Sequence, residues 1–107
     1  MSLPVTSLAA VTANADGKTV GGDRACRTWG MQVVLGGAVV ATGGTVKLHL
    51  SIDGTNWSEA VGTFTIGTSV NKDIVYAVDK PAVYARAVLA NLSGGTTPTV
   101  TAKIVGT

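Results

Sequence analysis

Residues 45–52 constrain the fold of this chain more than any other part of its sequence. Polar and apolar side chains alternate along this segment, with the apolar ones at Val46, Leu48, Leu50 and Ile52. A period of two residues is typical of a strand with one face buried. The segment runs directly into Asp53-Gly54, a dipeptide that favours hairpin turns because glycine adopts positive φ without steric cost. We therefore predict a strand and a hairpin here, with Trp57 folding back over the hairpin and largely buried.

Six other segments have extended or alternating patterns, and glycine-rich turn signals separate them. They cover residues 5–13, 29–35, 63–66, 74–78, 83–89 and 99–104. We expect Ile74, Tyr76 and Val78 to form one apolar face, and most of the aromatic side chains to point inward. No stretch keeps a helical period without interruption by glycine. The sequence predicts an all-β fold, a single antiparallel β-sandwich or barrel of seven or eight short strands.

The length of 107 residues fits one domain. Residues 1–12 are expected to be either an extended N-terminal arm or the first strand, and residues 13–107 to be the β-sandwich domain. Only 13% of the residues are charged and 46% are hydrophobic, a balance opposite to that of disordered chains. Residues 28–46 carry no charge, but glycines interrupt them repeatedly. They are expected to form two strands and a turn, and no membrane partner is predicted.

Composition also excludes several kinds of chemistry. A net charge of +2 is too small for binding nucleic acid by bulk charge. The single histidine, His49, cannot form a histidine-rich metal site, and nothing in the sequence brings Cys26 beside it as a nucleophile. The acidic residues lie in or beside turn signals, where side-chain to backbone hydrogen bonds are their usual role. We expect no enzymatic activity, no catalytic residues, no metal and no cofactor.

Residues 51–57, Ser-Ile-Asp-Gly-Thr-Asn-Trp, resemble a hairpin motif found in several β-protein families. The motif is similar to the Asp-box of sialidases and to a strand of discoidin-type carbohydrate- and lipid-binding modules. In those families the hairpin is structural, so the resemblance implies structural roles for Asp53, Gly54 and Trp57. It also leaves open a discoidin-like module for carbohydrate binding and host adhesion, the alternative in which a glycan is the partner.

A wider resemblance covers residues 46–57, 81–87 and 93–102, which are similar to small β-sandwich structural proteins of tailed bacteriophages. It implies a non-enzymatic capsid decoration (cement) protein, which binds the major capsid protein and sibling copies and stabilises the head. Such a protein is made in the host cytoplasm and resides on the capsid surface of the virion. A homo-oligomer is expected, and a trimer fits this role. A tail-associated β module is the other phage alternative.

The first residues of the chain are a candidate contact with the capsid. Pro4 restricts its neighbourhood to an extended form, and an extended segment can add a strand to the sheet edge of a partner. The predicted contact residues are Ser2, Leu3, Pro4, Val5 and Thr6.

Overall fold

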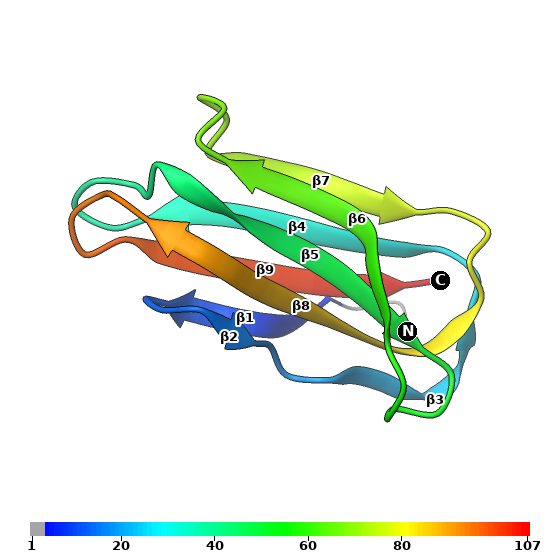
Figure 1. Ribbon diagram of the computed structural model, residues 1–107. Coiled ribbons are helices and arrows are strands. Elements are labelled where there is room, and N and C mark those ends of the chain that lie inside the picture. Colours follow the sequence, from blue (N-terminus) through cyan, green and yellow to red (C-terminus); the bar gives the residue numbers. More distant parts are fainter. Residues whose placement is uncertain (1–3) are drawn as a thin grey trace.

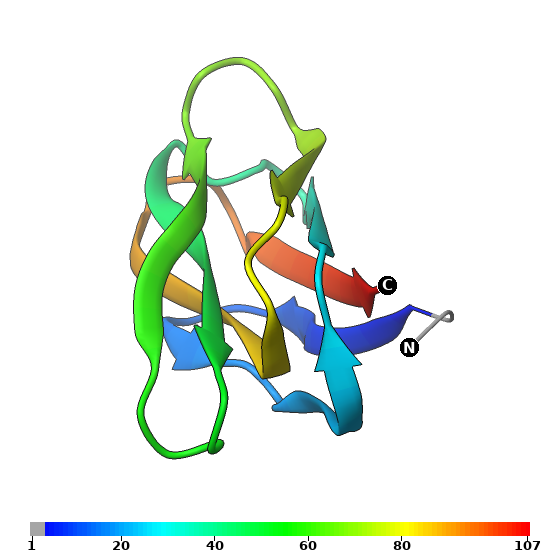
Figure 2. The same ribbon diagram turned by 90° about the vertical axis from the view of Figure 1, so that its right-hand side faces the viewer.

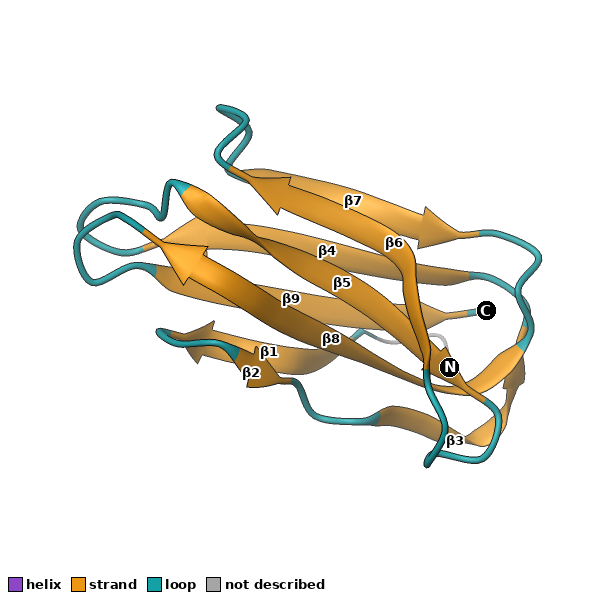
Figure 3. Ribbon diagram, viewed as in Figure 1, coloured by secondary structure: helices purple, strands orange, loops and turns teal. Residues whose placement is uncertain are grey.

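The computed structural model describes residues 4–107, which form nine strands and no helix (Figures 1 and 3). The strands are β1 (Val5–Val11), β2 (Ala15–Asp16), β3 (Val20–Cys26), β4 (Trp29–Gly36), β5 (Gly43–Ser51), β6 (Ser58–Ile66), β7 (Lys72–Ala77), β8 (Ala82–Ser93) and β9 (Thr99–Gly106). The prediction of an all-β fold is confirmed.

The strands make two antiparallel sheets that pack face to face, as Figure 2 shows in a view turned by 90°. Sheet A has the order β1-β9-β4-β7. Sheet B has the order β2-β8-β5-β6, and β3 also pairs with β8, beyond β2 along the same strand. None of the strands within residues 4–107 is shared between the sheets, so of the two predicted architectures these residues adopt the sandwich.

The core lies between the sheets and is built from alternate residues of each strand. Trp29 is fully buried near one end of β4, and Met31 and Val33 follow it on the same face. The predicted inward faces of β5, β8 and β9 are also buried, with Val46, Leu48, Leu50, Ala85, Ala87, Leu89, Val100, Ala102 and Ile104. Burial of these side chains is the main driving force for folding of such a domain.

The face of strand β7 that points inward is the opposite of the one we predicted. Ile74, Tyr76 and Val78 are exposed by 43%, 61% and 62%, whereas Ala77 is buried and Val75 half-buried. The register with β4 explains this, because Ala77 pairs with the buried Trp29 and Val75 with the buried Met31. Directly opposite residues in an antiparallel pair point to the same face, so Ile74 and Tyr76 point to the outer face of sheet A.

The predicted hairpin is present, but its connection is longer than a two-residue turn. β5 ends at Ser51 and β6 begins at Ser58, so residues 52–57 form the loop. Ile52 therefore lies beyond the strand and is 74% exposed, where alternation predicted an inward side chain. Gly54 has the positive φ expected of the turn glycine, +79°.

The N-terminal stretch forms β1, an edge strand of sheet A. Val5 and Thr6 pair with Ile104 and Lys103 of β9, so these two residues belong to the protein's own sheet and are not a free arm. Pro4 is exposed, and Ser2 and Leu3 lie outside the described residues. The Ser7 hydroxyl joins the two sheets at this edge, since it accepts the amide of Ala87 at 3.0 Å and donates to the carbonyl of Lys18 at 2.8 Å.

Strands β2 and β3 were not predicted. β2 has two residues, and β3 pairs with β8 only at Val20, Gly21 and Cys26, with an irregularity between Gly21 and Cys26. Neither segment contains an alternating pattern that would reveal it in the sequence. In the described part of the chain, no helix is long and apolar enough to cross a membrane.

Candidate interaction surfaces

The β5–β6 loop is organised around the carboxylate of Asp53. Asp53 Oδ1 accepts the amides of Thr55 and Asn56, both at 2.8 Å, and Oδ2 accepts the side-chain amide of Asn56 at 2.8 Å. Ser51 Oγ lies 3.0 Å from the same carboxylate and accepts the amide of Gly54 at 2.8 Å. These hydrogen bonds, those of Asn56 first, hold the pKa of Asp53 below its usual value. The predicted structural role of Asp53 in this loop agrees with its contacts.

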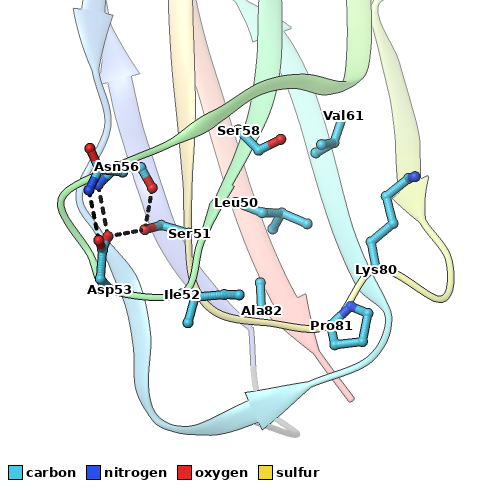
Figure 4. Close-up of a pocket in the computed structure, with 10 residues that line it drawn as sticks. All are labelled: Leu50, Ser51, Ile52, Asp53, Asn56, Ser58, Val61, Lys80, Pro81 and Ala82. Carbon is cyan, nitrogen blue, oxygen red and sulfur yellow. Dashed lines mark hydrogen bonds between the residues drawn. The ribbon is translucent and has the colours of Figure 1, made fainter.

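A hollow of about 450 Å³ lies beside this loop, between the end of β5, the start of β6 and the β7–β8 connection (Figure 4). Its lining is mostly apolar, with Leu50, Val61, Pro81 and Ala82 among its residues. Asp53 and Ser51 are at its rim, but their oxygens are directed into the loop hydrogen bonds (Figure 4). The Asp53 carboxylate at this rim therefore organises the loop.

Trp57 covers part of the outer face of sheet B. The guanidinium of Arg86 lies 4.4 Å from the centre of its ring, a cation–π contact. Trp57 directly precedes β6 and Arg86 is in β8, with β5 between these strands, so the indole reaches across β5. Trp57 is half-buried, so the predicted burial is found in part, and its ring lies against Arg86 on the outside of the sandwich. Trp29 is the tryptophan of the core.

His49 lies beneath this contact. It pairs with Arg86 across the β5–β8 ladder and is only 5% exposed, although it points to the outer face. Burial, and then the charge of Arg86, lower its pKa. The guanidinium of Arg86 also makes an ion pair with Asp16 of β2, with Nη1 and Oδ2 3.8 Å apart. This strand residue is an exception to the prediction that the acidic residues serve turns.

Tyr84 extends the covered area on the same face. It pairs with Ser51 in the ladder and is half-buried. A Cβ placed on Gly22 or Gly54 would lie 2.9 Å and 3.3 Å from opposite edges of the Tyr84 ring. These two glycines allow the backbone to close around the ring. Trp57, Tyr84, Arg86, Asp16 and His49 together form what we call the outer cluster of sheet B.

The outer face of sheet A is different, because its large apolar side chains are open to solvent. Val34, Ile74 and Tyr76 are exposed by 39%, 43% and 61%, and they come from the adjacent strands β4 and β7. We call these three residues, with the half-buried Val105 of β9, the apolar face of sheet A. Sequence reasoning missed it, because it assigned Ile74 and Tyr76 to the core. Contiguous exposed apolar side chains of this kind often mark interaction sites.

The fold keeps the two remaining candidates for a reactive pair, Cys26 and His49, apart from each other. Cys26 is 3% exposed in the core, beside Trp29 and Gly106, whereas His49 is on the outer face of sheet B. The structure therefore separates this pair. Among residues 4–107, no group of three or more His, Cys, Asp or Glu side chains could hold a metal ion.

Comparison with known proteins supports the fold. No protein-family model matches the sequence, and no curated protein matches it significantly. The structure is similar to the crystal structure of the SPBc2 prophage-derived protein YomS, with a TM-score of 0.60 and 12% sequence identity. The similarity covers 99% of this chain and 97% of that one, so the two share a whole domain. At this identity the likeness establishes a common small all-β fold.

Proposed function

We propose that this protein is a non-enzymatic structural protein of a tailed-phage virion, and more specifically a capsid decoration protein that binds the major capsid protein and stabilises the head. The apolar face of sheet A is the observation that carries the proposal. A protein that attaches to a flat protein lattice needs an exposed apolar surface with a polar rim, and needs neither catalytic groups nor a cofactor. The fold shared with a prophage-derived protein supports a phage role.

The structure changes where the attachment is expected. Two of the five residues predicted as a partner-binding arm, Val5 and Thr6, are paired with β9, so deleting them removes part of sheet A. The apolar face of sheet A is a surface that is already exposed in the folded protein. We therefore place the principal capsid contact on Val34, Ile74 and Tyr76. Ser2, Leu3 and Pro4 remain a predicted secondary contact.

The direct test has two parts. The first is quantitative mass spectrometry of purified virions, in which we expect a copy number comparable to that of the major capsid protein. A few copies per particle would contradict decoration and favour the tail-associated module. The second is addition of purified protein to heads that lack it, in which saturable binding is expected. Absence of binding to heads and tails alike would contradict a structural role in the virion.

A carbohydrate-binding function is the second candidate, and the outer cluster of sheet B favours it. Trp57 and Tyr84 lie on one face, beside the Asp16 carboxylate, whose side chain is 65% exposed. Aromatic rings flanked by polar groups are typical of sugar sites. However, one face of Trp57 is occupied by Arg86, and Gly22 and Gly54 close around the edges of Tyr84. Binding on a glycan array that Trp57→Ala abolishes would establish this function in place of decoration.

A further inference from the structure

The apolar face of sheet A contains a hollow of about 210 Å³ that includes Gly30. Gly30 pairs with Tyr76 on one side and with Val105 on the other. A Cβ at this position would lie 3.5 Å from Tyr76 Cε1 and 3.7 Å from Val105 Cγ1. Gly30 is buried between these two apolar side chains, and a methyl group at this position fits in ordinary contact with both. An apolar cavity of about 150 Å³ suffices to bind benzene, so the hollow is large enough for one aliphatic side chain of a partner.

The outward charged side chains of β4, β7 and β9 are lysines, and the exposed carboxylate of Asp73 lies beside Ile74 in β7, where it accepts the Ile74 amide. The outward positions of β7 and β9 include Lys72 and Lys103, and Lys103 lines the hollow together with Gln32. The other outward residues of β4, β7 and β9 are neutral: Gly30, Val34, Gly36, Ile74, Tyr76, Thr99, Thr101 and Val105. The two ion pairs found among the described residues are Arg27–Asp79 and Arg86–Asp16, so neither lysine forms an ion pair within residues 4–107. Lys103, which lines the hollow, favours negative charge on a complementary surface.

From these two observations we infer the chemistry of the partner: a protein segment that inserts one aliphatic side chain into the Gly30 hollow and places a carboxylate beside Lys103. The inference rests on the proposed function, since it takes the apolar face of sheet A as the docking face. A protein segment fits better than an anionic membrane. Polybasic membrane contacts use about four to eight lysines or arginines, whereas this face has two, and its hollow accepts a single side chain.

Gly30→Ala is the sharpest variant for testing this inference. The added Cβ makes ordinary van der Waals contacts with Tyr76 and Val105, so it occupies part of the hollow without displacing a neighbour. Lys103→Glu reverses the charge at the rim. Lys47→Glu is its matched control, because Lys47 is an outward lysine of β5 on sheet B. Thermal melting of each variant shows that the fold is retained.

The experiment is an NMR titration of the isotope-labelled full chain with the peptide acetyl-Glu-Leu-Glu-Leu-Glu-amide. We expect saturable shifts of the Gly30, Tyr76 and Lys103 amides. We expect the dissociation constant to rise by about tenfold, equivalent to 1.4 kcal/mol, in both Gly30→Ala and Lys103→Glu, and to stay unchanged in Lys47→Glu. Two further peptides separate the contributions: one with lysine in place of glutamate, one with serine in place of leucine. Both are expected to bind at least tenfold more weakly.

Several results would overturn the inference. Equal binding of the lysine peptide would remove the charge complementarity, and equal binding of the serine peptide would remove the role of the hollow. Binding to phosphatidylserine vesicles without binding to any peptide would identify a lipid surface instead. The inference also fails if the protein binds heads but the acidic peptide causes no shift at Gly30, and decoration then still stands. Peptide binding at Gly30 without binding to heads supports the inference and contradicts decoration.

Discussion

The aromatic side chains on the outer faces of the two sheets have opposite environments. On sheet B, Trp57 lies on Arg86, Arg86 pairs with Asp16, and His49 is buried beneath them. On sheet A, Tyr76 is 61% exposed and has apolar neighbours, and the nearby Lys72 and Lys103 form no ion pair within residues 4–107. In the cluster on sheet B the Arg86 guanidinium contacts both the Trp57 ring and the Asp16 carboxylate, although Arg86 Nε and His49 Nδ1 have no hydrogen-bond partner among residues 4–107. The face of sheet A leaves apolar side chains open to solvent, which is why we propose it as the docking face.

The largest effect on stability is expected from removing the aromatic ring of sheet B. Trp57→Ala abolishes the cation–π contact and uncovers Arg86 and His49, so we expect a loss of about 1–2 kcal/mol. For a domain of about this size, each kcal/mol lowers the melting temperature by about 4–8 °C. Thermal or denaturant unfolding measures this. An unchanged melting temperature would show that the outer cluster of sheet B does not stabilise the fold.

The Asp53 loop directly precedes Trp57 in the chain, and the stability that its hydrogen bonds contribute depends on pH. Because folding lowers the pKa of Asp53, its contribution is present above the pKa of the unfolded chain, about 4, and is lost as pH falls below that value. We expect Asp53→Asn to be less stable than the parent at neutral pH and to lose less stability on acidification. Asp23→Asn, a change of an exposed carboxylate in β3, is the matched control. Parallel acid profiles of Asp53→Asn and the parent would contradict this role.

A smaller effect on stability is expected at His49. The pKa of this residue depends on how completely the neighbouring side chains on the outer face of sheet B bury it. Burial first, and Arg86 second, lower this pKa below 6.5. The group is therefore harder to protonate in the folded state, and its contribution to stability is lost as pH falls below about 6.5. In Trp57→Ala we expect the pKa of His49 to rise toward its usual value, as measured by NMR titration. A pKa that stays as low as in the parent would show that Trp57 does not shield His49.

The smallest effect on stability is expected from the aromatic ring of sheet A. Tyr76 is exposed, so Tyr76→Ser should change the free energy of unfolding by no more than about 0.5 kcal/mol. A destabilisation as large as that of Trp57→Ala would mean that the two faces have the same structural role. The comparison between the faces would then be wrong.

The difference between the faces also explains what the sequence could and could not predict. Alternation identified the buried faces of β5 and β9 correctly, because both strands lie inside their sheets and one side of each must be buried; it failed at Ile52, which lies beyond the end of β5. In 74–78 the same kind of pattern predicted the wrong face. β7 is an edge strand whose register follows β4, and its apolar residues Ile74 and Tyr76 are left outside. An apolar pattern alone does not distinguish a core face from an exposed face.

The Asp53-Gly54 loop was predictable because its contacts are local and span only residues 51–56. The outer cluster of sheet B was not, because Trp57, Arg86 and Asp16 are far apart in the sequence and meet only through strand pairing. Strand β3 was not predictable because it also forms through long-range strand pairing. Its contacts with β8 depend on Val20, Gly21 and Cys26 and not on a repeating pattern. Long-range register is the information that the sequence pattern lacks.

The most direct test of the account is the occupancy of undecorated phage heads by two double variants with retained folds. Ile74→Ser/Tyr76→Ser alters the apolar face of sheet A, and Thr63→Lys/Thr65→Lys alters exposed outward residues of β6 on sheet B. We predict that the sheet A variant loses binding by about 100-fold or more, equivalent to about 2.7 kcal/mol, while the sheet B variant binds like the parent. Normal binding of the sheet A variant, or loss of binding only in the sheet B variant, would contradict the account.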